Sequence, residues 1–167
     1  MLTTCLLLTE TAAEANRSLK KTAMITIYQL KKDKRQISSI QKITLKDSDF
    51  ALQQIHGLFG SEEWWRQIAD GRLPLYTHGG TITRIDKLCM GNGAEFEMAS
   101  SDGTKESFFC ECNTPAQCDE YQVGRFVEID YVWQKYKVRY ISGSGLLDRK
   151  IVIEIRIDNS EPSSTGD

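Results

Sequence analysis

The chain has 167 residues, the length of one ordinary domain, and 40% of them are hydrophobic and 26% charged. This composition excludes wholesale disorder. The formal net charge of −2 excludes a bulk polycation that coats nucleic acid. The apolar run at 5–8 is far shorter than the roughly 20 residues of a membrane span, so we expect no membrane partner.

The two ends of the sequence differ from its middle. Residues 1–23 show no regular pattern and are expected to form a poorly ordered lead-in. Residues 159–167 are polar and lack large apolar groups, which is typical of a disordered tail. We therefore expect a single β-rich domain over 24–158. The odd number of cysteines, five, without a recognisable signal peptide favours free thiols and a cytoplasmic location.

The first part of this domain is predicted to be a β-hairpin over 24–45. Residues 24–30 alternate in the manner of a strand, with Ile25 and Ile27 on one face. Residues 31–35 are a charged break without apolar side chains, and the strand pattern then resumes through Leu45. Two such runs around a polar connection are typical of a hairpin.

A two-helix insert is predicted over 47–71. Ala51, Ile55 and Leu58 fall at i, i+4 and i+7, which is the spacing of a helical apolar stripe. Ser61 precedes two glutamates and is a suitable N-cap for a second short helix, which Gly71 is placed to end. The second helix lacks the basic surface of a DNA-recognition helix.

From 75 to 158 the apolar residues repeat every second position, with turn signals about ten residues apart. This spacing favours antiparallel strands over parallel βαβ units. The strongest predicted strand places Val127, Ile129, Tyr131 and Trp133 on one face. The fold class is therefore mainly β (α+β): a small antiparallel barrel of OB-like or SH3-like type, with the N-terminal hairpin and the helical insert.

The cysteines and His78 are the candidates for metal or catalytic chemistry. A zinc site would use Cys89, Cys110, Cys112 and Cys118, but their spacing lacks the usual Cys-x₂₋₄-Cys knuckle. Buried or inert thiols are the simpler interpretation. A cysteine paired with His78 is the corresponding enzyme hypothesis. We favour neither, and expect no cofactor and no catalytic residues.

A basic and aromatic strand is the candidate nucleic-acid surface. If the chain stays extended, Trp133, Lys135, Lys137 and Arg139 share one face, where an aromatic ring could stack on bases and the cations could contact phosphates. Ordinary outward lysines explain the same pattern, and a turn near Lys135 would divide it. Nucleic acid is therefore the alternative partner, and protein the favoured one.

The adjacent tryptophans Trp64 and Trp65 support a protein partner. Neighbouring helical residues point about 100° apart, so one ring can pack inside while the other is partly exposed. Aromatic side chains are enriched at interfaces. The simpler interpretation of the pair is that both rings plug the open end of the barrel. The sequence thus predicts a non-catalytic binding domain, with Trp65, Trp133, Lys135, Lys137 and Arg139 as its partner-binding residues.

Overall fold

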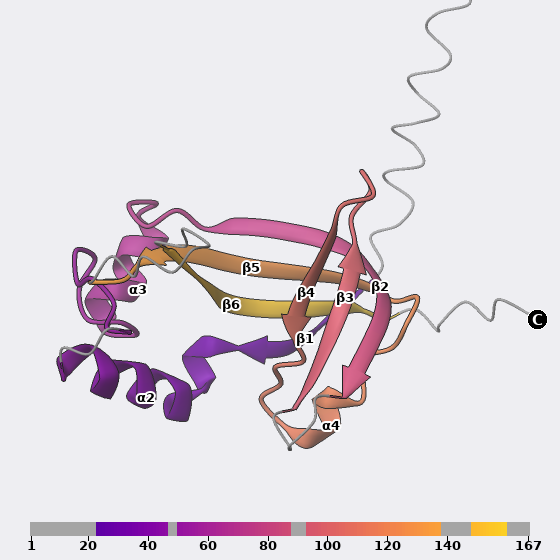
Figure 1. Ribbon diagram of the computed structural model, residues 1–167, viewed down its shortest axis with the longest axis horizontal. Coiled ribbons are helices and arrows are strands. Elements are labelled where there is room, and N and C mark those ends of the chain that lie inside the picture. The colour runs from indigo at the N-terminus through magenta and orange to yellow at the C-terminus, as the bar shows by residue number, and fades with distance from the viewer. Residues whose placement is uncertain (1–22, 47–49, 88–92, 138–147, 160–167) are drawn as a thin grey trace, which may run out of the picture.

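One antiparallel sheet organises the chain in the computed structural model, which describes residues 23–46, 50–87, 93–137 and 148–159. Its strand order is β1-β6-β5-β2-β3-β4 (Figure 1). The strands are β1 (Met24–Gln29), β2 (Tyr76–Lys87), β3 (Ala94–Ala99), β4 (Lys105–Phe109), β5 (Phe126–Lys135) and β6 (Asp148–Asp158). The helices are η1 (Leu30–Lys32), α2 (Lys34–Leu45), α3 (Glu62–Ala69) and α4 (Pro115–Cys118). The predicted mainly β, antiparallel character is confirmed.

The predicted hairpin over 24–45 is wrong, because its second half is helix α2. Ile37, Ile40 and Thr44 are buried at helical spacing, and these β-branched residues resemble a strand only by residue type. The side chain of Asp33 caps the helix by accepting a hydrogen bond from the Gln36 amide at 2.8 Å. Strand β1 pairs instead with β6, at the opposite end of the sequence.

The first helix of the predicted insert is also wrong. Residues 50–60 contain no helix; the Gln53 amide donates to the Lys135 carbonyl at 2.8 Å, and the Lys137 amide donates to the Ala51 carbonyl at 2.7 Å. This segment therefore lies extended beside the end of β5, where Leu52 forms a bridge with Tyr136. Ala51, Leu52 and Phe59 are buried, but Ile55 is 69% exposed, so the predicted helical stripe does not form one buried face.

The second predicted helix is confirmed as α3. The Ser61 hydroxyl accepts a hydrogen bond from the Trp64 amide at 3.2 Å, as expected of its N-cap. Gly71 follows the helix with a φ of 71°, a left-handed conformation that glycine adopts without strain. Trp64 is fully buried and donates from its Nε1 to the Gln134 side chain at 3.0 Å, which attaches α3 to β5.

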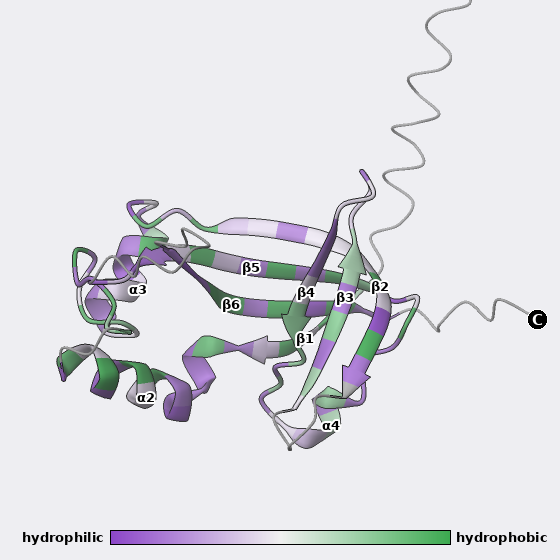
Figure 2. Cartoon of the chain, in the orientation of Figure 1, coloured by the Kyte–Doolittle hydropathy of each residue, from purple (hydrophilic) through white to green (hydrophobic). Residues whose placement is uncertain are grey.

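The buried face of the sheet changes midway along β5. Val127 and Ile129 are buried on one face, whereas Val132 and Gln134 are buried on the other. Across from this change, Ile153 is an extra residue in β6, because Asp130 pairs with Glu154 and Tyr131 with Val152. Figure 2 shows apolar and polar residues alternating along both strands. The apolar core therefore lies on opposite faces at the two ends of the sheet.

The sheet is curled but not closed, so the predicted barrel is wrong. Strands β1 and β4 are its two edges and do not pair with each other. The edge of β1 is instead bonded to the segment after β4: Asn113 Oδ1 accepts from the Gln29 amide at 2.7 Å, and Asn113 Nδ2 donates to the Gln29 carbonyl at 3.2 Å. A side-chain amide thus supplies bonds that a neighbouring strand would make in a barrel.

Several expectations fall on residues that the structure does not describe. They are residues 1–22 of the lead-in predicted over 1–23, and residues 160–167 of the tail predicted over 159–167. Within the described ranges, no helix has both the length and the apolar character needed to cross a membrane.

Candidate protein-binding surface

One face of the sheet curls around a group of aromatic side chains. Three strands lie between β6 and β4 in the sheet order, yet Lys150 on β6 bonds to Glu106 on β4. Such a contact requires the sheet to bend so that β6 and β4 approach each other on the face that carries Lys150 and Glu106. We call this face the concave face. By strand alternation, Tyr76, Tyr131 and Trp133 point to the same face.

The rings on the concave face surround the ammonium group of Lys150. Its Nζ lies 4.6 Å from the ring centroid of Tyr131, 4.9 Å from that of Phe108 and 5.4 Å from that of Trp133. Tyr131 also stacks on Tyr76 at 5.6 Å and meets Trp133 edge-on at 6.0 Å. We call these four rings and Lys150 the aromatic cluster. Cation–π contacts of this kind hold the rings in fixed positions.

The charge of Lys150 is balanced by Glu106, whose carboxylate bonds to the ammonium group. The other oxygen of Glu106 lies 3.8 Å from His78 Nδ1, and His78 Nε2 lies 2.6 Å from the Ser100 hydroxyl. Burial, and then the nearby negative charge of Glu106, raise the pKa of Tyr131, so this phenol stays neutral. The aromatic cluster therefore combines its rings with a cation that is paired with the neighbouring Glu106 carboxylate.

The aromatic cluster is partly open to solvent. Trp133 is 39% exposed and Tyr76 45%, and the neighbouring Leu75 is 46% exposed. Large aromatic side chains held in one orientation are enriched at protein interfaces, where they anchor a partner at little cost in conformational entropy. The arrangement is therefore typical of a protein-binding surface.

Only part of the predicted basic strand lies on this surface. Trp133 and Lys135 are exposed on the same face of β5, as the alternation indicates. Strand β5 ends at Lys135, and Lys137 turns to the helical end of the molecule, where its Nζ donates to the Thr44 carbonyl at 3.1 Å. Arg139 lies outside the described residues. Strand β5 therefore does not present a continuous row of three cations beside Trp133.

Trp65 lies away from the aromatic cluster, on α3. Its ring is half-buried, packs edge-on against Trp64 at 4.8 Å and donates from Nε1 to the Gly60 carbonyl at 3.1 Å. The ammonium group of Lys31 lies 5.9 Å from the ring centroid. These contacts give Trp65 a packing role, and its predicted role as a partner anchor stays a prediction.

The cysteines and His78 do not converge on one site in the described residues. Cys112 and Cys118 form a disulfide, so the predicted free thiols are wrong for this pair, and its sulfurs are not free for a zinc site. Burial, with a smaller effect of Glu95, raises the pKa of the Cys110 thiol to about 11. Cys89 is not described, and among the described residues no group of three or more His, Cys, Asp or Glu residues could hold a metal.

Sequence reasoning missed most of the aromatic cluster. The alternation over 127–133 indicated that Tyr131 and Trp133 share a face, but of these two only Trp133 was predicted to bind a partner. Nothing in the sequence signals that Lys150 meets Phe108, because that contact depends on the curl of the whole sheet.

The structure thus defines a class of fold, an open antiparallel sheet that leaves an aromatic cluster partly exposed. Comparison with family models is more specific: residues 24–158 match the model described as immunity protein RhsI2. The match spans every described helix and strand, and the chain belongs to the RhsI2 immunity protein family. A search of curated proteins found no match.

Proposed function

We propose that this chain binds a cognate Rhs toxin and neutralises it by binding, without catalysis. Membership of the RhsI2 immunity protein family is the observation that carries the proposal. Neutralisation by binding needs a surface of fixed shape, because a rigid surface loses little entropy when the complex forms.

The concave face is the surface we propose for the toxin. Its aromatic cluster combines the exposed rings of Tyr76 and Trp133 with the buried packing of Phe108. Lys150 bonds to Glu106 and contacts three rings, so the cluster is ordered before any partner arrives. Hot spots at interfaces are rich in tryptophan and tyrosine, and truncating such an anchor costs more than about 1 kcal/mol.

A protein partner fits this surface better than nucleic acid. Binding to phosphates depends on unpaired cations. Lys150 is paired with Glu106, and Lys137 of the predicted basic row bonds to the Thr44 carbonyl, so of that row β5 presents Lys135 beside Trp133 and not a series of cations that could follow a phosphate backbone. The cytoplasmic location inferred from the cysteine count remains a prediction.

The test is binding of the purified cognate toxin to the wild type, to Trp133→Ala and to Leu45→Ala, measured by calorimetry. Leu45 is the control because it is 65% exposed on α2, outside the aromatic cluster. We expect Trp133→Ala to raise Kd at least ten-fold and Leu45→Ala to change it less than two-fold. The same variants should rank in the same order when they protect cells that express the toxin.

Two outcomes separate the parts of this proposal. If the wild type does not bind the toxin, the proposed function is wrong. If it binds and Trp133→Ala binds equally well, the function stands but the concave face is not the toxin-binding surface.

A further inference from the structure

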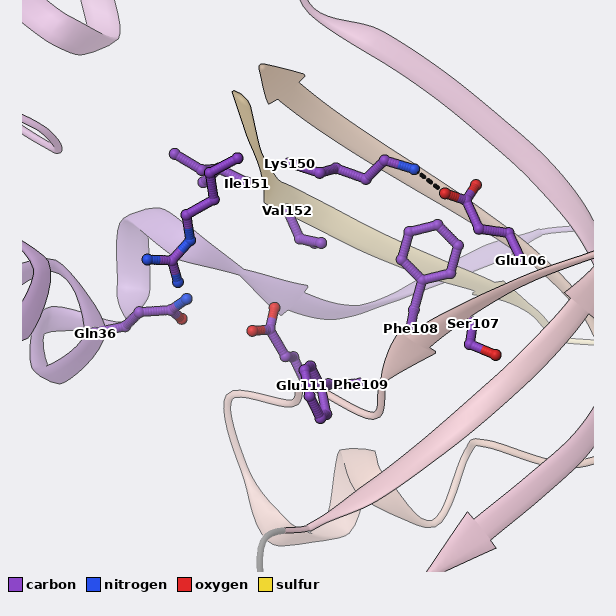
Figure 3. A pocket seen from close by; sticks show the side chains of 10 residues that line it. Gln36, Glu106, Ser107, Phe108, Phe109, Glu111, Lys150, Ile151 and Val152 are labelled. Carbon is purple, nitrogen blue, oxygen red and sulfur yellow. Dashed lines mark hydrogen bonds and ion pairs between the residues drawn. The ribbon is translucent and has the colours of Figure 1, made fainter. Parts of the chain in front are cut away.

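A cavity of about 270 Å³ lies beside the aromatic cluster, between β4 and the first residues of β6 (Figure 3). Apolar walls come from both strands, with Phe108 and Phe109 on one side and Ile151 and Val152 on the other. The cavity is much larger than the roughly 30 Å³ that one water molecule occupies in the liquid. It has room for a side chain from a partner.

Glu111 brings an acceptor without a partner to this cavity. It follows β4, and Figure 3 shows its carboxylate and the Gln36 amide directed toward the same space from two separate elements. Its Oε2 atom is fully buried and has no hydrogen-bond partner. A buried polar atom left without a partner costs about 1–3 kcal/mol, so a donor that reaches this oxygen would be stabilised.

Arg149 brings a donor to the same cavity. Its side chain is half-buried and lines the cavity, close enough to Glu111 to lower the pKa of that carboxyl. None of the ion pairs among the described residues includes Arg149, so its guanidinium keeps free N–H donors. The second cation of the cavity, Lys150, is bonded to Glu106.

The cavity therefore presents one acceptor and one donor group side by side. A cationic ligand would meet the acceptor but be repelled by Arg149 and Lys150. An anionic ligand would meet the donor, but it would face the Glu106 carboxylate and would bring no N–H group to the buried Oε2 of Glu111. A primary carboxamide carries an N–H donor and a carbonyl acceptor on neighbouring atoms and has no net charge, so it can satisfy both groups.

We infer that this cavity binds the carboxamide of an asparagine or glutamine side chain of the toxin, with Glu111 accepting from its amide nitrogen and Arg149 donating to its carbonyl oxygen. This inference rests on the proposed function and names the chemistry of one anchor. The aromatic cluster adjoins the cavity, because Phe108 and Lys150 belong to both. One toxin segment can therefore contact the rings and place a side chain in the cavity.

Three small probes of equal chain length test the ligand chemistry without the toxin. We would titrate ¹⁵N-labelled wild-type protein with butyramide, butyrate and butylammonium at equal ionic strength, and follow the amide signals of Ser107, Glu111 and Ile151. We expect saturable shifts with butyramide and at least three-fold weaker binding of both ions. Tighter binding of either ion, or no saturable shift with butyramide, would overturn the inference.

Variants then test the cavity against the toxin itself. Arg149→Met and Glu111→Leu each remove one of the two polar groups and keep a side chain of similar size. Arg72→Met is the matched control, because Arg72 is exposed and pairs only weakly with Asp70 at 3.9 Å.

We expect both cavity variants to raise the Kd for the toxin at least ten-fold and the control to change it less than two-fold. If the wild type binds the toxin and the cavity variants bind as tightly as the control, this inference fails while the proposed function survives. If the wild type does not bind, the proposed function itself fails. The probe titration on the wild type is independent of how well any variant folds.

Discussion

The buried carboxyl of Glu111 predicts an unusual dependence of stability on pH. Burial is the main cause that raises the pKa of Glu111 from 4.5 to about 7; Gln36 and Arg149 lower it and Asp33 raises it further. The folded protein therefore holds a proton that the unfolded chain releases. Because the folded state binds more protons in this range, its stability falls as the pH rises from about 4.5 to about 7.

The size of the effect follows from the two pKa values. A difference of about 2.5 in pKa, at about 1.4 kcal/mol for each unit, gives about 3 kcal/mol of stability lost between low pH and pH 8. Glu111→Gln keeps the shape of the side chain but has no proton to release. We expect the free energy of unfolding of this variant, relative to wild type, to rise by about 3 kcal/mol from pH 4.5 to pH 8.

Urea denaturation of both proteins at half-unit steps of pH measures this difference directly. The steepest change should lie between pH 5 and 7, with a plateau above it. Glu62→Gln is the control, since it removes the same charge from an exposed position on α3. If the wild type and Glu111→Gln change in parallel with pH, then Glu111 does not retain its proton in the folded state and the reasoning is wrong.

Two further predictions concern the sheet. A Cβ at Gly80 would lie 2.6 Å from the Ala99 carbonyl oxygen, which is part of the backbone. A Cβ at Gly79 would have the end of the Phe126 ring as its nearest neighbour, at 2.9 Å. Gly80→Ala should therefore lower the free energy of unfolding by about 1–3 kcal/mol more than Gly79→Ala. Arg156 bonds to Asp130 at 2.6 and 3.1 Å, so Arg156→Met should cost about 2 kcal/mol at pH 7. Burial alone would raise the pKa of Asp130, but hydrogen bonds from Arg156 hold the pKa below its ordinary value. The loss of stability caused by Arg156→Met should therefore shrink below pH 4, as the Asp130 carboxyl takes up a proton. An equal loss at pH 3.5 and pH 7 would contradict this.

The sequence was informative where local pattern and tertiary structure agree. Alternation identified the strands after 75, and the capping signal at Ser61 identified α3. It misled at 34–45, because isoleucines three positions apart resemble a strand by their β-branching although they line one face of helix α2. It misled again at 50–60, where apolar residues have helical spacing but the segment is not a helix. Its conformation depends on a bridge between Leu52 and Tyr136, which lies more than 80 positions away in the sequence.

The candidate site was harder to predict because it depends on the curl of the sheet. Trp133 and Lys135 could be placed on one exposed face from their spacing alone. Their neighbour Lys150 could not, because its contact with Phe108 crosses from one part of the sheet to another. The Cys112–Cys118 disulfide was missed for a different reason: an odd cysteine count argued for free thiols throughout.

The change of buried face along β5 explains how a small sheet can keep an aromatic surface exposed. Near α3, the core is built on the face that carries Val132 and Gln134, so Tyr131 and Trp133 on the opposite face are not needed for it. The extra residue Ile153 in β6 is what turns Lys150 toward those rings, since without it the alternation of β6 would point the ammonium group to the helical side. The bulge at Ile153 thus divides the concave face into two parts. One part carries the buried Val127 and Ile129 of the core, and the other carries Trp133, which is exposed to a partner.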